Sequence, residues 1–432
     1  MPKSGNITGR NNLKFKNINI HTPSNRSDPP CILCRGTKLL CGKSSCPVVA
    51  KLHYKVKTMD MINSNLIDGS SPPSVFIGRS GYPKINIGPM TTPFKGDSSQ
   101  LDIPELWTTK TITEFIEMRT QLIRGKFSVD IYDVESSNRI VEYTREIALA
   151  QDYIDMETEF YKQPRGALTL LSEVQPHGPS GYLKSLNVDN IKIDQKIEKA
   201  FYDTDLTARE ATIGLYNNSI RVSKLQRAFS VGAFGLKNNR RFVPTRWSIT
   251  AVDSLLGENL MKYTRTNPLI NEFRVFERYH LDNRWIILMM PSQWCYELIE
   301  AWYPETTWNP FSSEIQIFGD HEWHKGRSTY AQIGGCYYAA RLAVNEYLNN
   351  ERRQAGVVVL REAHPGYILP VGVWNVRENV RAALRTRPFT FNTLEEALKH
   401  ISTRFDIPRK RWILNSAILK DKLYQKRIDD FF

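Results

Sequence analysis

The sequence predicts a mixed α/β (α+β) core flanked by a small N-terminal cysteine knuckle and a flexible C-terminal peptide. Three observations carry this prediction. Segments with the period of an amphipathic helix alternate with short apolar runs typical of strands through most of the 432 residues. Four of the six cysteines lie within residues 31–46. The chain ends on two adjacent phenylalanines that follow a charged stretch.

The first half of the core is predicted to contain strands followed by helices. Residues 58–100 carry short apolar runs separated by Pro and Gly, which indicate strands joined by tight turns. Thr111 and Glu114 have the spacing of a capping box and predict a helix that ends before Gly125. The predicted elements of this half are strands at 74–78, 84–88 and 129–134 and helices at 111–124, 205–216 and 249–263.

The second half of the core is predicted to continue the α/β mixture. Its central feature is a strand, a loop, a helix and a strand, which is the order of a crossover unit with the loop at the carboxyl edge of the sheet. Gly334 and Gly335, inside that predicted helix, favour close packing against a neighbour. The predicted elements are strands at 314–319 and 356–360 and helices at 330–348, 375–384 and 393–400.

The positive charge of the chain lies at its two ends. The formal net charge is +13; residues 1–60 hold 11 Lys and Arg against two Asp, and residues 404–427 hold eight against two Asp. A near-neutral body with two basic arms suits contact with an anionic polymer, and solubilising tails are the alternative. Since no run of 18 apolar residues and no N-terminal apolar segment occurs, we expect a cytoplasmic protein with no membrane contact.

The clustered cysteines have the spacing C-x₂-C-x₆-C-x₄-C, which fits one closed tetrahedral site for a structural Zn²⁺. An iron–sulfur cluster and a set of free thiols are the alternatives. Basic residues around the cysteines suit phosphate contacts, although zinc knuckles also bind proteins. The predicted metal ligands are Cys31, Cys34, Cys41 and Cys46, and the basic nucleic-acid candidates beside them are Arg35, Lys38 and Lys43.

The last eight residues have the pattern Q-x-x-(aliphatic)-x-x-F-F. Ile428, Phe431 and Phe432 have the spacing i, i+3 and i+4, so one helical turn places all three on one side as an apolar plug. The pattern resembles the PIP box, the peptide by which DNA replication and repair proteins dock on a sliding clamp of the PCNA type. Folding of the two phenylalanines onto the protein's own core is the alternative. The predicted clamp-binding residues are Gln425, Lys426, Arg427, Ile428, Asp429, Asp430, Phe431 and Phe432.

Residues 319–328, between a predicted strand and a predicted helix, form the densest polar segment of the core. Its two histidines are three residues apart, so the H-E-x-x-H metalloprotease pattern, which needs four, is excluded. Its carboxylates and lysine are similar in kind, though not in spacing, to the set with which nucleases hold Mg²⁺ or Mn²⁺. A solvated loop is the alternative. The catalytic candidates are Asp320, Glu322, Lys325, His321, His324 and Glu362, the last expected at the same sheet edge as Asp320.

Residues 240–250 interleave arginines with aromatic residues. Arginine beside aromatic rings follows a phosphate backbone and stacks on bases in single-stranded nucleic-acid sites. Pairing with core carboxylates such as Asp253 is the alternative. The nucleic-acid candidates in the core are Arg240, Arg241, Arg246 and Arg327.

These motifs together resemble those of the archaeal Nre family. The segments that carry the resemblance are the cysteine cluster, 243–248, 319–324, 369–375 and the terminal motif. Membership implies an archaeal DNA-repair protein with a C4-type zinc finger at the four cysteines and clamp docking through the PIP box, but it implies no chemistry for the core. The expected organisation is a flexible basic arm at 1–30, the zinc finger at 31–57, an Nre N-terminal core region at 58–300, an Nre C-terminal core region with the β–loop–α–β order at 301–415, and a basic tail with the PIP box at 416–432.

The leading hypothesis is a nucleoid-associated DNA-damage-repair protein that binds DNA and docks on the sliding clamp. A metal-dependent nuclease or other DNA-processing enzyme centred on Asp320, Glu322 and Lys325 is one alternative, with Mg²⁺ or Mn²⁺ as its cofactor. A purely structural adaptor is another.

Overall fold

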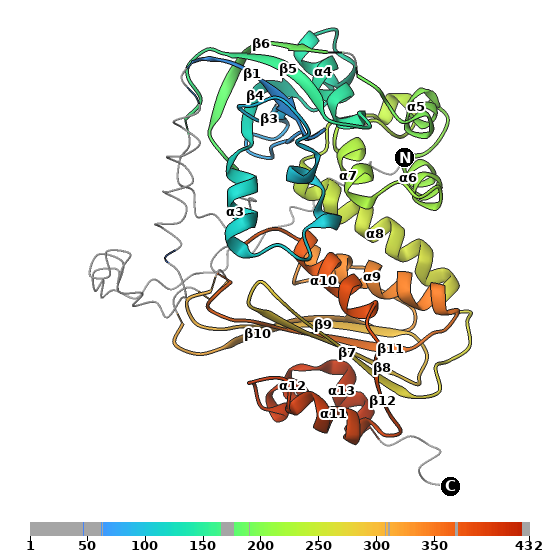
Figure 1. Ribbon diagram of the computed structural model, residues 1–432. Coiled ribbons are helices and arrows are strands. Elements are labelled where there is room, and N and C mark those ends of the chain that lie inside the picture. The colour runs from blue at the N-terminus through green and yellow to red at the C-terminus, as the bar shows by residue number, and fades with distance from the viewer. Residues whose placement is uncertain are drawn as a thin grey trace, which may run out of the picture.

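The computed structural model contains two six-stranded sheets with helices packed between and around them (Figure 1). The mixed α/β prediction is therefore confirmed. The structure describes residues 46, 62, 64–165, 177–189, 191–306, 308–309, 312–367 and 370–425. The predicted basic arm, three of the four cysteines, the basic residues beside them and the terminal residues 426–432 lie outside these ranges.

The first sheet comes from the N-terminal half and has the strand order β1-β5-β6-β4-β2, with β3 paired to β4. All of its pairs are antiparallel except β4 with β6. The predicted strand at 74–78 is an extended segment with one bridge, Val75 to Pro89. The strands are β1 (Leu66–Ser71), β2 (Lys84–Ile87), β3 (Met90–Thr91), β4 (Ile123–Asp130), β5 (Ile154–Phe160) and β6 (Ser180–Val188).

Helices cover the first sheet and lead down to the second (Figure 1). The predicted capping box is present, since Thr111 and Glu114 satisfy each other's backbone N–H groups. The helix that it opens ends earlier than predicted because Ile123 already pairs with Thr91 of β3, so the strand expected at 129–134 begins at Ile123. The helices of this half are α3 (Ile112–Thr120), α4 (Arg139–Leu149), α5 (Gln195–Tyr202), α6 (Ala208–Asn217), α7 (Val222–Ser230) and α8 (Thr245–Thr264), with 3₁₀ turns at Ser99–Asp102, Pro104–Leu106, Asp133–Glu135 and Lys237–Asn239.

The second sheet comes from the C-terminal half and has the strand order β10-β9-β11-β8-β7-β12. Helices α9 and α10 cover one face, and α11, α12 and α13 cover the other (Figure 1). Its strands are β7 (Phe273–His280), β8 (Asn283–Met290), β9 (Cys295–Trp302), β10 (Gln316–Glu322), β11 (Gly356–Ala363) and β12 (Phe389–Phe391). Its helices are α9 (Gly335–Glu351), α10 (Trp374–Leu384), α11 (Leu394–Ser402), α12 (Arg409–Asn415) and α13 (Ala417–Tyr424).

The order strand, loop, helix, strand is present as β10, α9 and β11, but the expected crossover is not. Strand β9 lies between the two; it is antiparallel to β10 and parallel to β11. Strands β10 and β11 therefore run in opposite directions, and the end of β10 lies at the edge of the sheet where β11 begins. The parallel neighbours are instead β9 and β11, and the chain that connects them contains both β10 and α9.

The two halves of the chain meet along α8 and α9, which pack against each other. Helix α9 begins at Gly335 rather than at Tyr330, because Gly334 has φ +67° and is the residue before the first turn. A fourth apolar cluster, which includes Trp107, Phe115 and Trp374, joins α3 to the start of α10. Among the described residues, no helix is long and apolar enough to cross a membrane.

Candidate nucleic-acid interface

Two segments that the sequence singled out, 243–248 and 370–375, lie where α8 and α9 begin, while 319–324 runs beside the middle of these helices. Residues 243–248 enter α8, 319–324 end β10, and 370–375 enter α10. The first residue of α9, Gly335, lies between two of them: a Cβ atom at this position would be 3.0 Å from Thr250 Oγ1 and 3.1 Å from a methyl group of Val373. The close packing expected at the glycine pair is therefore present at Gly335.

Asp320 holds the loop between β10 and α9 in place. Its Oδ2 accepts hydrogen bonds from Arg327 Nη2 at 2.9 Å and from the Gln332 backbone at 2.7 Å. Burial disfavours the charge of this carboxylate, but the bonds from Arg327 and from the Gln332 and His321 backbones outweigh burial and lower its pKa below the ordinary value. The guanidinium of Arg327 also lies 4.6 Å from the centre of the Tyr337 ring. Asp320 and Arg327 therefore form an ion pair that orders the loop.

Glu322 is enclosed. Only 2% of its surface is exposed, and its two oxygens accept from Trp294 Nε1 at 3.1 Å and Arg341 Nη1 at 2.9 Å. Arg341, on α9, is 1% exposed and also lies 3.7 Å from Glu258 on α8. Glu322 thus connects β10 to α9, and its arginine connects α9 to α8.

The other candidates around β10 do not gather about these carboxylates. Asp320 is paired across the strands with Leu298 of β9, and Leu298 is paired with Val359 of β11. All three side chains therefore lie on the face covered by α9. Because Glu362 is three residues beyond Val359, it faces the opposite side of the sheet. The expected shared edge for Asp320 and Glu362 is therefore wrong. His321 also faces away from Asp320, while His324 and Lys325 are exposed in the turn after β10.

Glu362 lies in a separate cluster on the face covered by α11, α12 and α13. It is fully buried and accepts from the Ile407 backbone at 2.9 Å and from His364 Nε2 at 3.1 Å. Within the described part of the chain, Glu362, His364 and Asp406 are the one group of three acidic or histidine side chains close enough to share a metal ion. Arg284 already pairs with Asp406, so this cluster is partly neutralised by a cation.

The arginines at the entry to α8 divide into one buried and two exposed side chains. Arg240 is buried and donates to the backbone carbonyls of Gly235, Phe201 and Asp203. Its charge therefore stabilises the fold rather than meeting solvent. Arg241 and Arg246 are exposed.

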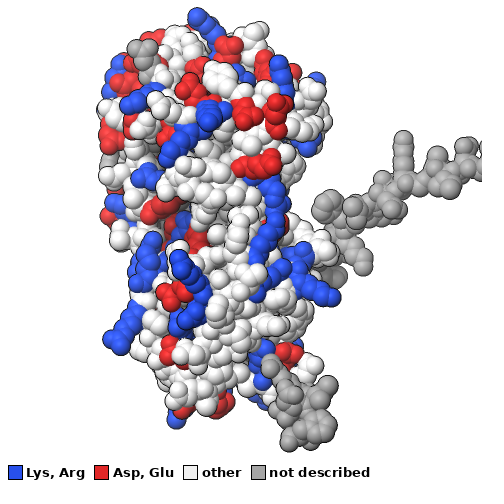
Figure 2. All heavy atoms as spheres, turned by 90° about the vertical axis from the view of Figure 1, so that its right-hand side faces the viewer, with Lys and Arg blue, Asp and Glu red and all other residues white. Residues whose placement is uncertain are grey.

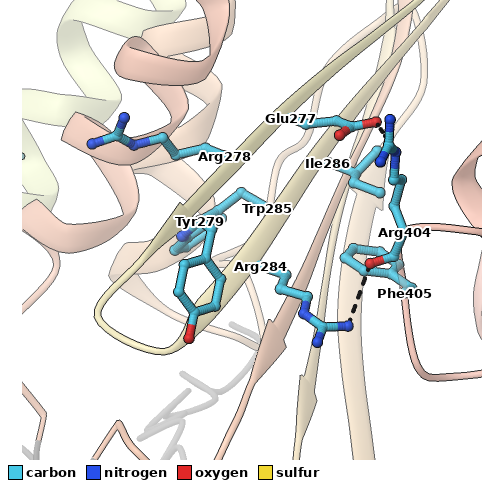
Figure 3. Close-up of a pocket in the computed structure, with 8 residues that line it drawn as sticks. All are labelled: Glu277, Arg278, Tyr279, Arg284, Trp285, Ile286, Arg404 and Phe405. Atoms are coloured by element: carbon cyan, nitrogen blue, oxygen red, sulfur yellow. Dashed lines mark hydrogen bonds and ion pairs between the residues drawn. The ribbon is translucent and has the colours of Figure 1, made fainter.

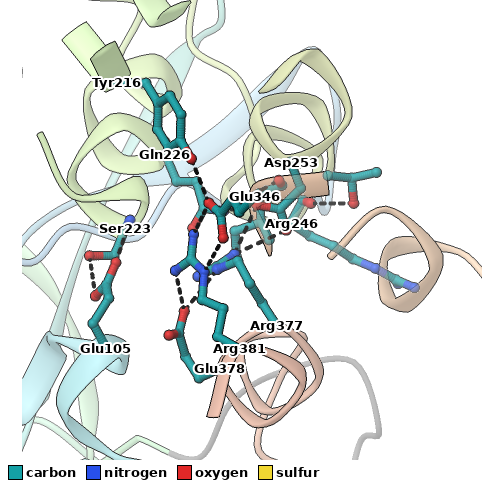
Figure 4. A network of polar contacts seen from close by, with 12 residues as sticks. Glu105, Tyr216, Ser223, Gln226, Arg246, Asp253, Glu346, Arg377, Glu378 and Arg381 are labelled. Carbon is teal, nitrogen blue, oxygen red and sulfur yellow. Dashed lines mark hydrogen bonds and ion pairs between the residues drawn. The ribbon is translucent and has the colours of Figure 1, made fainter. Parts of the chain in front are cut away.

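Asp253, the expected core partner of these arginines, pairs with a different one. Figure 4 shows the network: Arg377 Nη1 contacts both oxygens of Asp253, at 2.9 and 3.0 Å, and Gln226 donates to one of them. Arg381 in turn binds Glu346 and Glu378. Complete burial raises the pKa of Asp253 to about 6 despite Arg377. This network links α7 and α8 of the first half to α9 and α10 of the second.

An open pocket of about 420 Å³ lies beside the β7–β8 hairpin (Figure 3). Three arginines line it, and each has a partner: Arg278 donates to the Thr108 carbonyl, Arg284 pairs with Asp406, and Arg404 pairs with Glu277. Its cations are thus engaged within the protein, and we assign no ligand to it.

Sequence reasoning placed Trp247 beside the arginines of 240–250 but missed the exposed aromatic residues that other segments bring to the start of α8. Trp247 is 44% exposed and its ring lies 5.2 Å from that of Tyr82, which is 47% exposed. Tyr330, in the loop before α9, is 65% exposed. Tyr82 lies 165 residues from Trp247 in the sequence, so no local pattern could have joined them.

Two of the terminal candidates fall within the described residues. Cys46 is half-buried, and Gln425 is exposed directly after α13. The remaining zinc and clamp-binding candidates lie outside the described residues and stay predictions.

Lys and Arg are interspersed with Asp and Glu on the face that carries α5 and α6 (Figure 2). Opposite charges alternate most closely in the upper part of this view. This mixture agrees with the near-neutral charge of the core sequence.

Comparison with known proteins shows similarity to archaeal Nre proteins. Residues 40–309 match the model of the archaeal Nre N-terminal region, and residues 322–431 match that of the Nre C-terminal region. The chain is 39% identical to the DNA repair protein NreB of Archaeoglobus fulgidus over 90% of its length and 97% of the relative's. It is 37% identical to NreA of that organism over 88% and 95%, and 28% identical to NreA of Haloferax volcanii over 79% and 84%. No solved structure matches.

Proposed function

The chain belongs to the archaeal Nre family, and from this membership we propose that it is a DNA-damage-repair protein that binds DNA and docks on a PCNA-type sliding clamp. The observation that carries the proposal is the similarity over about nine-tenths of the chain to relatives named DNA repair proteins. The match includes both Nre regions, so it covers the core and the C-terminal motif up to residue 431.

DNA contact is proposed for the basic ends and the zinc knuckle. Residues 1–60 carry 11 Lys and Arg against two Asp, and the four clustered cysteines offer the thiolates that a structural Zn²⁺ prefers. Because these Lys and Arg residues lie at the ends of the chain, they can contact DNA phosphates although the core is nearly neutral. The affinity for DNA that such contacts supply falls as the salt concentration rises. Arg241 and Arg246 add exposed cations on the core.

Clamp docking is proposed for residues 425–432. Helix α13 packs on β9 through buried Ile418 and Leu419, and Gln425 follows it at the surface. The rest of the motif continues from this exposed point. A peptide of this kind acts as a tether, because docking beside DNA raises the effective concentration of weak DNA contacts.

Co-elution with the purified clamp tests the docking proposal. The double variant Phe431→Ala/Phe432→Ala is expected to lose co-elution while its unfolding midpoint stays that of the wild type. Tyr424→Ala is the matched control, since Tyr424 is an aromatic residue 71% exposed just before the motif. Continued co-elution of the double variant would show that the tether is elsewhere.

The structure favours an adaptor over the nuclease alternative. Asp320 and Glu322 each have an arginine partner, and among the described residues no third acidic or histidine ligand joins them. A nuclease assay of wild type and Asp320→Ala with Mg²⁺ or Mn²⁺ is expected to detect no cleavage by either protein. Cleavage by the wild type that is lost in the variant would establish the enzyme.

A further inference from the structure

The start of α8 carries an aromatic surface that the basic ends do not explain. We infer that Tyr82, Trp247 and Tyr330, with Arg79 and Arg246 beside them, form a platform on which unpaired bases of single-stranded DNA stack. This inference rests on the proposed DNA-repair function and deepens it, because it names the form of DNA that the core contacts.

The first part of the platform is the pair of Tyr82 and Trp247. Their ring centres are 5.2 Å apart with an angle of 58° between the planes, and nearly half of each side chain is exposed. Large apolar rings are costly to leave in water, so an exposed pair is typical of a binding surface.

The pair is held by backbone contacts between distant segments. Ile77 and Thr245 exchange two hydrogen bonds of 2.9 Å, one through the Thr245 hydroxyl and one between backbones. The Pro83 carbonyl accepts from Ile131, whose own carbonyl accepts from Phe242. These bonds fix the turn that carries Tyr82 against the start of α8, so the rings are positioned before any ligand binds.

Tyr330 extends the surface along the first turns of α8. Its hydroxyl is hydrogen-bonded to Thr250, and its ring lies 5.4 Å from that of Tyr338. Thr250 is three residues after Trp247, so Trp247 and the residue that holds Tyr330 lie about one turn apart on the same face of α8. Tyr330 is therefore fixed at its hydroxyl and lies against Tyr338, while 65% of the residue remains exposed.

Exposed cations lie beside these rings. Arg246 directly precedes Trp247, and Arg79 begins the turn whose backbone bond to Tyr82 is 3.3 Å; both arginines are exposed. Arginine next to aromatic faces matches the alternation of phosphate and base along a single strand. A duplex hides its base faces, so it cannot use the platform. Single-stranded DNA is the occupant that fits both the rings and the charges.

Fluorescence anisotropy on the full chain tests this inference, with a labelled 20-nucleotide oligo(dT) and a labelled duplex of equal length as probes. Trp247→Ala is expected to weaken oligo(dT) binding by about tenfold and duplex binding by less than about twofold. Trp247→Tyr, which keeps a ring, is expected to retain most of the affinity. Trp323→Ala is the matched control, because Trp323 is equally exposed, at 43%, in the turn after β10.

The outcomes separate this inference from the proposed function. If Trp247→Ala binds oligo(dT) as tightly as the wild type, or if Trp323→Ala loses as much affinity, the platform is wrong while duplex binding still supports DNA contact by the ends. If the wild type binds neither probe, both proposals fail. Unfolding midpoints equal to that of the wild type exclude misfolding as the cause of a loss.

Discussion

Glu322 is expected to be a structural residue whose removal destabilises the fold. Glu322 and Arg341 are 2% and 1% exposed, and their 2.9 Å ion pair joins β10 to α9. Glu322→Ala leaves this guanidinium with Ser254 at 3.3 Å, Glu258 at 3.7 Å and the rings of Tyr337 and Tyr338. Breaking a buried ion pair by removing one partner costs about 3 to 5 kcal/mol, so the free energy of unfolding should fall by about that amount. Urea denaturation followed by tryptophan fluorescence measures it.

Two further variants make the reasoning on Glu322 specific. Glu258→Ala removes the outer partner of Arg341, and because the Glu258 side chain is 40% exposed, we expect a loss of at most about 1 kcal/mol. The double variant Glu322→Ala/Arg341→Met removes both buried charges and should recover much of the stability. A Glu322→Ala protein whose stability lies within about 1 kcal/mol of the wild type would refute the structural role.

Three other predictions follow from the described residues and from the cysteine spacing. Burial raises the pKa of Asp253 from 3.8 to about 6, so the folded protein binds this proton more tightly than the unfolded chain does. The resulting contribution to stability, about 3 kcal/mol, is fully present below about pH 4 and is lost as pH rises through 6. Asp253→Asn should remove this pH dependence from urea denaturation at about pH 4 to 7. Gly69→Ala should lower the free energy of unfolding by at least about 2 kcal/mol, because its Cβ would lie 1.9 Å from the Thr92 carbonyl oxygen. Gly214→Ala, with free space in α6, should raise the free energy of unfolding by roughly 0.5 to 1 kcal/mol. Thermal unfolding of the two variants and the wild type measures both effects. The purified chain should carry one Zn²⁺, and Cys46→Ser should lower the metal content. Elemental analysis that finds iron and sulfide instead of zinc, together with absorption of visible light, would favour the iron–sulfur alternative.

Local signals in the sequence predicted α3, α6, α8, α9, α10 and α11 but missed α4, α5, α7, α12 and α13. The capping box predicted at Thr111 is present in the structure and opens α3, and a second box at Thr393 opens α11. Such boxes depend on residues three apart, so the sequence contains all the information needed. The end of α3 was misplaced because pairing of Ile123 with β3 competes with continuation of the helix.

Features that depend on distant segments could not be predicted in this way. The direction of β10 is set by pairing with β9, and the register of β10, β9 and β11 places Asp320 and Glu362 on opposite faces. Arg240 lies beside Arg241 in sequence, yet it is buried and donates to three backbone carbonyls, two of them about 40 residues away. Neither the role of Glu322 nor the pairing of Tyr82 with Trp247 leaves a local pattern, because each depends on tertiary packing.

The most direct test of the account measures DNA affinity with and without the clamp. Labelled gapped DNA, with the clamp loaded or absent, is titrated with wild type and with Phe431→Ala/Phe432→Ala. We expect the loaded clamp to tighten wild-type binding by about 100-fold or more and to leave the variant unchanged, because the terminal motif supplies the second point of attachment. Equal binding by the two proteins on clamp-loaded DNA would contradict the proposal that this chain reaches DNA through a clamp-docked C-terminus.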